Sequence, residues 1–257
     1  MRIVDLSAPI TSTDAEAPRF ARTVIDYIDH DGGAGDIEQQ FGVPRRLLRN
    51  GEGWARETFT YLGTHNSTHV DAPYHYNTVV AGERAQTIDE LPLERFFAPG
   101  VVVDFTGKAD GDAITAVEMQ QAVAAADHAL AEGDIVLVHT GRDAFYGELD
   151  YMFLGPGVTA EATHWLYDHG VRMMGIDAWG WDQPLDVQAR EALERDEPGV
   201  FWAAHQCDLP YSQIERLVNL SALPPTGFTV ACFPLRIMGA SGAPARVVAI
   251  LDAPAAP

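Results

Sequence analysis

The sequence has 257 residues, 47% of them hydrophobic, so it can bury a sizeable core, and we expect one domain over residues 1–257. Lys and Arg total 17 against 37 Asp and Glu, a formal net charge of -20 that repels phosphate backbones and anionic lipid headgroups. Nucleic acid and membranes are therefore not expected as partners, and the acidic surface is interpreted as an aid to solubility.

The lack of a targeting signal and the small number of cysteines predict a cytoplasmic location. The N-terminal stretch MRIVDLSAPI has no basic region followed by an apolar run and a cleavage site, so no export signal is expected. No window approaches about 18 consecutive apolar residues, the length of a membrane-spanning helix. Cys207 and Cys232 are too few for a disulfide framework and lack CxxC spacing, which predicts two free thiols.

The N-terminal region differs from the rest of the chain in its composition. Residues 7–42 are rich in Asp, Glu, Gly and Pro and show no sustained helical or strand periodicity. We therefore expect a long irregular excursion, which either forms a lid or is a surface loop without a role in chemistry.

The middle of the chain alternates between strands and helices. The expected elements are strands at 101–105, 134–139 and 171–177, with helices at 115–128 and 159–169 between them. Thr115 and Glu118 have the spacing of a capping box, and Thr159 can cap the second helix. Short connections between such elements imply parallel strand pairing with right-handed crossovers, so this part is expected to be α/β.

The last third changes character. Segments 214–220, 227–233 and 245–251 are apolar, lie between Pro and Gly turns, and have no evident helix between them. They are predicted to be strands that join an antiparallel or mixed sheet.

The stretch HNSTHVDAPYH, residues 65–75, concentrates ligand-type side chains. They are His65, His69, Asp71 and His75. Their even offsets put all four on one face of a strand, but a straight strand would spread them over roughly 33 Å. A continuous helix is excluded because Pro73 lacks an N–H and biases Ala72 away from helical angles. The backbone must therefore turn near residues 71–73 and fold His75 back toward the other histidines.

The ligand types favour a metal. Neutral imidazoles with a carboxylate suit zinc, manganese or ferrous iron, and the absence of cysteine argues against a closed structural zinc site. An open coordination position would hold water. Further ligands must come from elsewhere, and the candidates are His205, in the apolar segment FWAAHQC, and Glu215, in IERLVNL. The alternatives are ordinary polar residues in a surface loop and purely structural roles for His205 and Glu215.

At this point the sequence resembles the metal-dependent cyclase-family hydrolases, which include kynurenine formamidases, isatin hydrolases and aromatic polyketide cyclases. Their signature, His-x-Gly-Thr-His-x-Asp-x-Pro-x-His, is matched by residues 65–75 at every ligand-type position. The one departure is Ser67, where the family usually has a glycine suited to positive φ. The opening strand around residues 5–10, the central segments and the closing stretch 234–251 extend the resemblance over most of the chain.

The resemblance implies a fold, a ligand set and an assembly. The fold would be α/β with a swivelling β/β/α core and a mixed sheet. His65, His69 and Asp71 would bind a first ion, and Asp71 would also touch a second ion held by His205, with Glu215 contributing to the pair. His75 would be the acid/base. One or two Mn²⁺ or Zn²⁺ ions would serve as cofactor, and the protein would form a homodimer or homotetramer.

Three functional hypotheses follow for a small-molecule substrate. The first is hydrolysis of a small amide, cyclic amide or lactone by metal-activated water, with His75 as acid/base. The second is a cyclase that closes an aromatic polyketide-type substrate without adding water. The third is a non-catalytic metal-binding protein, against which the extra histidine beside the ligands argues.

Aromatic residues are the candidates for substrate binding. Trp179 and Trp181 flank Gly180 and would face the same way on an extended segment, where they could hold a flat ring. The alternative is that both tryptophans pack in the core beneath a turn. Phe20 is the candidate for the aromatic residue that the family carries in its N-terminal loop.

Overall fold

The computed structural model describes residues 1–251, and by internal contacts the chain forms two compact units. The main unit comprises residues 1–9 and the chain from Ser67 onward, and the small unit is Ile10–Asn66. The prediction of one domain over residues 1–257 stays a prediction.

A mixed sheet forms the centre of the main unit. Within the described residues it has nine strands, in the spatial order β1 (Arg2–Asp5), β15 (Val248–Leu251), β13 (Phe228–Ala231), β7 (Phe97–Asp104), β9 (Ile135–His139), β11 (Met173–Ile176), β12 (Ser212–Glu215), β4 (His69–Asp71) and β14 (Gly242–Pro244). The central strands β7, β9, β11 and β12 run parallel, and every other pairing in this sheet is antiparallel. The predicted α/β class with a mixed sheet is confirmed.

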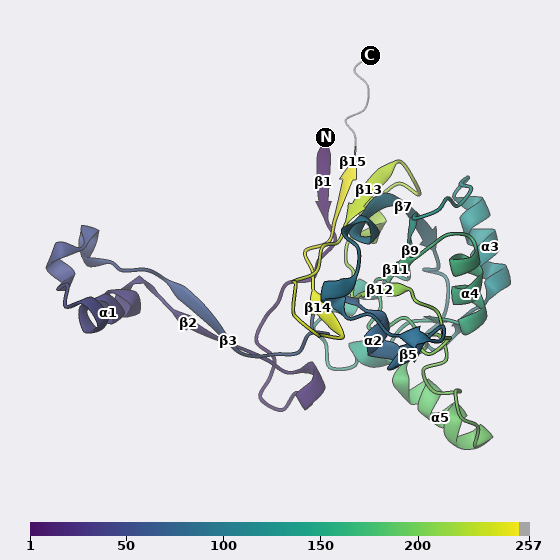
Figure 1. The fold of residues 1–257 in the computed structure, drawn as a ribbon, viewed down its shortest axis with the longest axis horizontal. Coiled ribbons are helices and arrows are strands. Elements are labelled where there is room, and N and C mark those ends of the chain that lie inside the picture. Colours follow the sequence, from purple (N-terminus) through teal and green to yellow (C-terminus); the bar gives the residue numbers. More distant parts are fainter. Residues whose placement is uncertain (252–257) are drawn as a thin grey trace, which may run out of the picture. The chain divides into compact units, whose positions relative to one another are not determined.

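The α-helices of the main unit are α2 (Pro73–Tyr76), α3 (Ala116–Ala125), α4 (Ala160–Asp168) and α5 (Leu185–Arg195). Side-chain caps begin α3 and α4, whereas α2 and α5 begin without one. Thr115 and Glu118 form the predicted capping box, in which the Glu118 carboxylate accepts the Thr115 N–H at 2.9 Å. The Thr159 hydroxyl accepts the Ala162 N–H at 3.2 Å at the start of α4. Figure 1 shows α3 and α4 side by side along the parallel strands.

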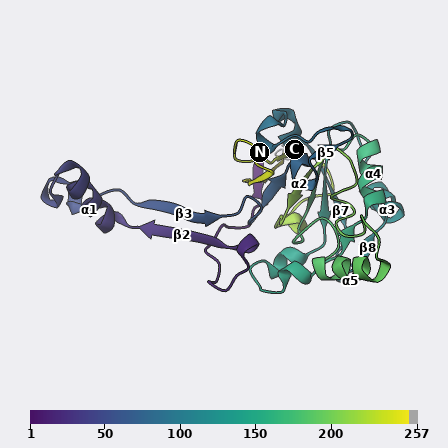
Figure 2. The ribbon, with the colours of Figure 1, turned by 60° about the horizontal axis from the view of Figure 1, so that its bottom comes forward.

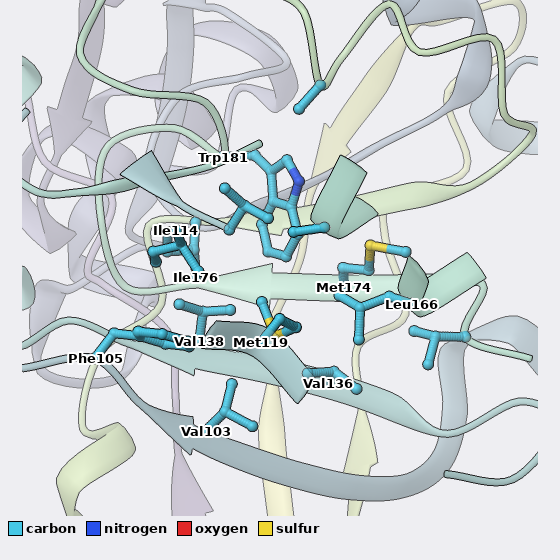
Figure 3. Packing of buried hydrophobic residues seen from close by; sticks show 14 of the residues in the cluster. Val103, Phe105, Ile114, Met119, Val136, Val138, Leu166, Met174, Ile176 and Trp181 are labelled. Atoms are coloured by element: carbon cyan, nitrogen blue, oxygen red, sulfur yellow. The ribbon is translucent and has the colours of Figure 1, made fainter. Parts of the chain in front are cut away.

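The parallel strands are buried on both faces, as expected for strands covered by crossover helices. Val136 and Val138 of β9 face the core that contains Met119 of α3 and Leu166 of α4 (Figure 3). Ile135, the residue before Val136, belongs to the core on the opposite face. The strand sequences are therefore almost continuously apolar because the sheet has a hydrophobic core on each of its faces.

Short strand pairs complete the main unit. They are β5 (Val79–Val80) with β6 (Glu83–Arg84), and β8 (Ala113–Ile114) with β10 (Gly157–Val158). No helix among the described residues 1–251 is long and apolar enough to cross a membrane.

The small unit corrects the expectation of an irregular excursion over residues 7–42. It contains β2 (Thr23–Ile28), paired antiparallel with β3 (Arg56–Leu62), and α1 (His30–Phe41), all visible in Figure 2. Glycine-rich HDGGAGDIEQQF is a poor helix by propensity. A Cβ on Gly33 would lie 1.7 Å from the Trp54 carbonyl oxygen, so glycine is what lets α1 pack directly on that backbone. Packing thus overrides propensity here.

The predicted strand at 214–220 is also shorter and earlier than expected. β12 ends at Glu215, because Arg216 adopts a φ of 58°, and a 3₁₀ turn follows at Leu220–Ala222. Glu215 is therefore the last residue of its strand rather than near its beginning.

Candidate metal centre

The turn predicted within residues 65–75 is present. β4 ends at Asp71, and Pro73 occupies the first position of α2, where its missing N–H costs nothing. His75 lies on α2, and its Nε2 atom is 4.0 Å from Oδ2 of Asp71. Because the chain changes from strand to helix at Ala72, His75 lies beside the Asp71 carboxylate.

Strand pairing brings a second carboxylate to the same face. β4 pairs antiparallel with β12, so that Glu215 lies opposite His69 and Gln213 lies opposite Asp71. Directly opposed residues of an antiparallel pair share a face and have neighbouring side chains. The backbone register alone thus places Glu215 beside the predicted ligands.

Ser67, the departure from the family signature, has a φ of 56°, in the region that favours glycine. Its hydroxyl donates to the Ala8 carbonyl at 2.9 Å, which helps to stabilise this conformation. The Ser67 carbonyl in turn lies 2.9 Å from Nδ1 of His69. When Nδ1 carries the proton and donates there, the lone pair of Nε2 is directed toward the carboxylates.

Two carboxylates each lie between the same two histidines. Asp71 Oδ1 is 3.3 Å from Nε2 of His69, and Asp71 Oδ2 is 4.0 Å from Nε2 of His205. Glu215 Oε2 is 3.6 Å from Nε2 of His69, and its Oε1 is 3.5 Å from Nε2 of His205. All four side chains are buried. The structure therefore places these four predicted metal ligands next to one another.

The spacing of these atoms fits a divalent cation. Two ligands that each lie about 2.1 Å from one ion in tetrahedral geometry are separated by about 3.4 Å. The measured separations of 3.3–4.0 Å lie near this value. Two imidazoles and two carboxylates suit zinc or manganese, and carboxylates that face both histidines can serve either one ion or a bridged pair.

Asp182 orients His205 and was not found from the sequence. Its carboxylate makes a short hydrogen bond with Nδ1 of His205 and accepts the backbone N–H groups of Ala204 and His205 at 2.8 and 3.1 Å. This is the carboxylate–histidine arrangement that supports metal ligands. Burial lowers the pKa of His205, but the carboxylates of Asp182 and Glu215 outweigh it and raise the pKa to about 10. The excess of negative charge favours a cation at Nε2.

Glu215 is held as a carboxylate. Burial raises its pKa, but the His205 and His69 imidazoles outweigh burial, so that the net pKa lies below its ordinary value. Oε1 of Glu215 also accepts the backbone N–H of Trp181 at 2.9 Å. The loop after β11 therefore fixes the orientation of the carboxylate that ends β12.

His75 differs from the buried ligands in its exposure. Its side chain is 22% exposed, against 1% for His69 and 4% for His205. A histidine beside the ligands that solvent can reach suits an acid/base better than a ligand. Its predicted role as the acid/base stays a prediction.

His65 and Phe20 belong to the small unit. His65 lies in the turn that follows β3, one residue before the unit ends at Asn66, and it is partly buried. Phe20 lies in a 3₁₀ turn and is exposed. The metal-ligand role of His65 and the substrate role of Phe20 stay predictions.

The tryptophan pair behaves differently at its two positions. The prediction that the Trp181 ring binds substrate is corrected, because this ring is fully buried in the helix-facing core (Figure 3). Its Nε1 donates to the Thr163 hydroxyl at 2.9 Å. The alternative that the tryptophan packs in the core therefore holds for Trp181. Its backbone N–H, and not its ring, contacts the site, through Glu215. Trp179 is half-buried, and its ring lies under the Arg216 guanidinium at 4.4 Å. Its role in substrate binding stays a prediction.

Trp202 is an aromatic residue at the centre that the sequence analysis missed. Its ring stacks on His205, with centroids 4.4 Å apart and planes 11° apart, and it meets His75 edge-to-face at 5.0 Å. The available signal was its position three residues before a candidate ligand, in the apolar segment FWAAHQC. The sequence pattern instead predicted Trp179 and Trp181, which flank a glycine, as the substrate-binding aromatic residues.

The cysteines do not join the ligand set. Both are free thiols, as predicted, with Cys232 buried and Cys207 partly buried. Burial raises the pKa of Cys207 to about 12, and it also raises the pKa of Cys232. Thiols with raised pKa values are poor metal ligands and poor nucleophiles at neutral pH.

Comparisons with known proteins agree with this fold. A family model described as a putative cyclase matches residues 4–183. A kynurenine formamidase of Salinibacter ruber is 31% identical over 196 residues, which cover 75% of this chain and 78% of that protein. An isatin hydrolase of Roseibium aggregatum is 29% identical over 208 residues, which cover 74% of this chain and 73% of that protein.

A solved structure described as a potential metal-dependent hydrolase with cyclase activity shares the fold with a TM-score of 0.65. It is 22% identical, and the match covers 98% of this chain and 99% of that one. The class that fold and site define is a metal-dependent hydrolase, as predicted. The chain belongs to the putative cyclase family.

Proposed function

We propose that this hydrolase uses one or two divalent ions, Mn²⁺ or Zn²⁺, to cleave the C–N bond of a small amide, such as an aryl formamide or a cyclic amide, with lactones as a related substrate class. The observation that carries the proposal is the buried set of two imidazoles and two carboxylates with a more exposed histidine beside it. The kynurenine formamidase and isatin hydrolase among its relatives support the choice of substrate class.

His69, Asp71, His205 and Glu215 would hold the metal, with His65 as a further ligand contributed by the matched motif. A divalent ion in such a site supplies Lewis acidity, which lowers the pKa of water from 15.7 to about 7 and polarises a carbonyl group. The chain's own contribution is to orient the ligands. The Ser67 carbonyl and the Asp182 carboxylate face Nδ1 of His69 and His205, which leaves Nε2 of each ring for the metal, and the Trp181 N–H donates to Glu215.

His75 would move the protons. Its Nε2 faces the Asp71 carboxylate at 4.0 Å while part of the ring remains accessible to solvent. An imidazole there can accept a proton from the attacking water and then donate one to the leaving nitrogen, since histidine titrates near neutral pH. This use of one residue for both transfers requires no further titratable group in the site.

A cyclase is the second candidate, because the same ligands could activate a carbonyl for ring closure without water. The relatives named above are hydrolases, and this favours hydrolysis. The two reactions differ in their products, since hydrolysis of an amide releases an acid and an amine, whereas cyclisation releases no new carboxylic acid.

The experiment is proton release by the purified protein, reloaded with Mn²⁺ or Zn²⁺, against formanilide, isatin and an unsaturated lactone. We expect metal-dependent acid release from at least one amide, and none from the chelator-treated protein. Acid release that persists without metal would contradict the proposed mechanism. Demonstrated metal binding without acid release from any substrate would overturn the hydrolase proposal in favour of the cyclase.

The remaining proposals concern assembly and location. We propose a homodimer or homotetramer in the cytoplasm, with a small molecule rather than nucleic acid or membrane as partner. The net charge of -20 supports the exclusion of nucleic acid, and the family resemblance supports the oligomer. Sedimentation velocity of the purified protein tests the assembly, and a monomer would contradict it.

A further inference from the structure

Trp202 touches both functional parts of the metal centre. Its indole stacks on the ligand His205 at 4.4 Å and meets the ring of His75 edge-to-face at 5.0 Å, with an interplanar angle of 74°. The indole therefore borders the point where the metal ligands and the acid/base meet.

The backbone holds Trp202 in a costly conformation. Its φ is 64°, which a bulky side chain seldom adopts, and such conformations persist only where the surrounding structure imposes them. The Trp202 N–H donates to Oε1 of Gln188, a buried residue of α5, at 2.7 Å. Further along, Asp182 accepts the N–H groups of Ala204 and His205. Hydrogen bonds on both sides thus fix the direction of the indole.

The other two tryptophans near the site have different surroundings. The Trp181 ring is fully buried, and the Trp179 ring lies under the Arg216 guanidinium. Trp202 is only half-buried, and its ring borders that of His75. It therefore supplies an aromatic surface of the main unit at the proposed acid/base.

We propose that Trp202 determines specificity, as an aromatic wall beside His75 that favours substrates with a planar aryl group next to the scissile amide. The proposal rests on the proposed amide hydrolysis and narrows its substrate class. A flat ring can stack on the indole or meet its edge, whereas a saturated ring of similar size keeps only the apolar contact. Selectivity between the two is therefore the property that this residue controls.

The test compares formanilide with N-cyclohexylformamide, which differ in the planarity of the ring. In Trp202→Leu, which keeps an apolar side chain, we expect the ratio of kcat/KM for the aryl over the cyclohexyl substrate to fall about 3- to 10-fold, chiefly through KM of the aryl substrate. Trp202→Phe, which keeps an aromatic face, should retain most of the ratio. Metal content measured on each variant establishes that the centre is intact.

Trp165 offers a matched control. It is half-buried on α4 and packs on His169 at 4.3 Å, a second tryptophan–histidine contact outside the described ligand set. Trp165→Leu should leave the aryl preference unchanged. A ratio that is unchanged in Trp202→Leu, or that falls equally in both variants, would overturn the role of Trp202.

A binding measurement separates this proposal from the proposed function. Calorimetric titration of the metal-loaded protein with benzamide and cyclohexanecarboxamide needs no turnover. Preference for benzamide that is lost in Trp202→Leu and kept in Trp165→Leu supports the aromatic wall, even if the wild-type protein hydrolyses neither formamide, an outcome that would count against hydrolysis alone. Equal binding of both amides by the wild-type protein would overturn the wall.

Discussion

Among the histidine–aspartate pairs of the main unit, those of Asp71 and Asp177 have different surroundings. In one, Nε2 of His69 lies 3.3 Å from Asp71, and in the other, Nε2 of His139 lies 3.9 Å from Asp177. Asp71 and Asp177 are both fully buried. His139 ends β9 and Asp177 follows β11, at the carboxyl ends of parallel strands where sites often gather. Residue type and burial of the carboxylate therefore do not distinguish the two pairs.

The difference lies in what the carboxylate oxygens face. Asp177 Oδ1 accepts the N–H and the hydroxyl of Thr140 at 2.6 and 2.7 Å, and Oδ2 accepts the Gly141 N–H at 2.9 Å. These bonds anchor the loop after β9. The Asp71 oxygens instead face Nε2 atoms of His69, His75 and His205, beside a second carboxylate that faces two of the same rings. We interpret a buried carboxylate as a metal ligand when several imidazole nitrogens lie around its oxygens, and as a structural anchor when backbone N–H groups donate to them.

The largest effect that would sharpen this comparison is expected for Asp71→Asn. The substitution keeps the volume but removes the charge and one of the two oxygens that face histidines, so we expect loss of bound metal and of at least about a thousandfold in kcat/KM. Metal stoichiometry by mass spectrometry and acid release are the measurements. Asp177→Asn is the matched control. Equal metal content in Asp71→Asn and the wild type would remove Asp71 from the ligand set.

His75→Ala should separate proton transfer from metal binding. We expect kcat to fall about a hundred- to ten-thousandfold while metal content stays at the wild-type level, because the missing group is an acid/base. Added imidazole should restore part of the rate. If the variant instead lost its metal, His75 would be a ligand and its assignment would be wrong.

Asp182→Asn tests the support of His205. The amide can still face Nδ1 but no longer offers two charged oxygens to the imidazole and the backbone N–H groups. Metal affinity should fall about 10- to 100-fold, as is typical when the partner of a liganding histidine is changed. Competition with a chromogenic chelator measures this change. An unaltered affinity would show that His205 needs no carboxylate to act as a ligand.

Asp177→Asn should affect stability and leave metal binding unchanged. An amide nitrogen would face the Gly141 N–H, so the free energy of unfolding should fall by about 1–3 kcal/mol. Metal content should match the wild type. A loss of metal in this variant would erase the distinction between the two pairs.

The same variant carries a pH signature. Burial raises the pKa of Asp177 above its ordinary value of 3.8, despite the hydrogen bonds from Thr140 and Gly141. Since the folded state holds this proton more tightly than the unfolded state, the carboxyl's contribution to stability declines as pH rises from 3.8 through the raised pKa. Asn cannot titrate, so the stability gap between wild type and variant should narrow over that range in urea unfolding experiments. A gap that widens with pH would contradict the raised pKa.

Much of the fold follows from local sequence patterns. The capping box at Thr115 and Glu118 and the cap at Thr159 mark real helix starts, since hydrogen-bonding side chains at these positions satisfy backbone groups within a few residues. The apolar segments of β7, β9 and β11 are strands, as predicted. These features depend on neighbours in the sequence, and a single chain therefore discloses them.

The ligand-bearing turn was also predictable, because Pro73 forbids a continuous helix and geometry forbids a straight strand. The sequence also identifies His69, Asp71, His205 and Glu215 as candidate ligands. The sequence did not show which side chains lie next to each candidate ligand. Only the register of β4 against β12 places Glu215 opposite His69, and strand register depends on residues far apart in the chain.

The sequence by itself determined the α/β class, the helix caps and the ligand types of a metal centre, because these depend on short-range periodicity and residue chemistry. The tertiary structure alone decided that Asp182 orients His205, that Trp202 and not Trp181 reaches the centre, and that glycine-rich residues 30–41 form a helix. Each of these outcomes is set by which distant surface a side chain packs against, and that information arises only when the chain closes on itself.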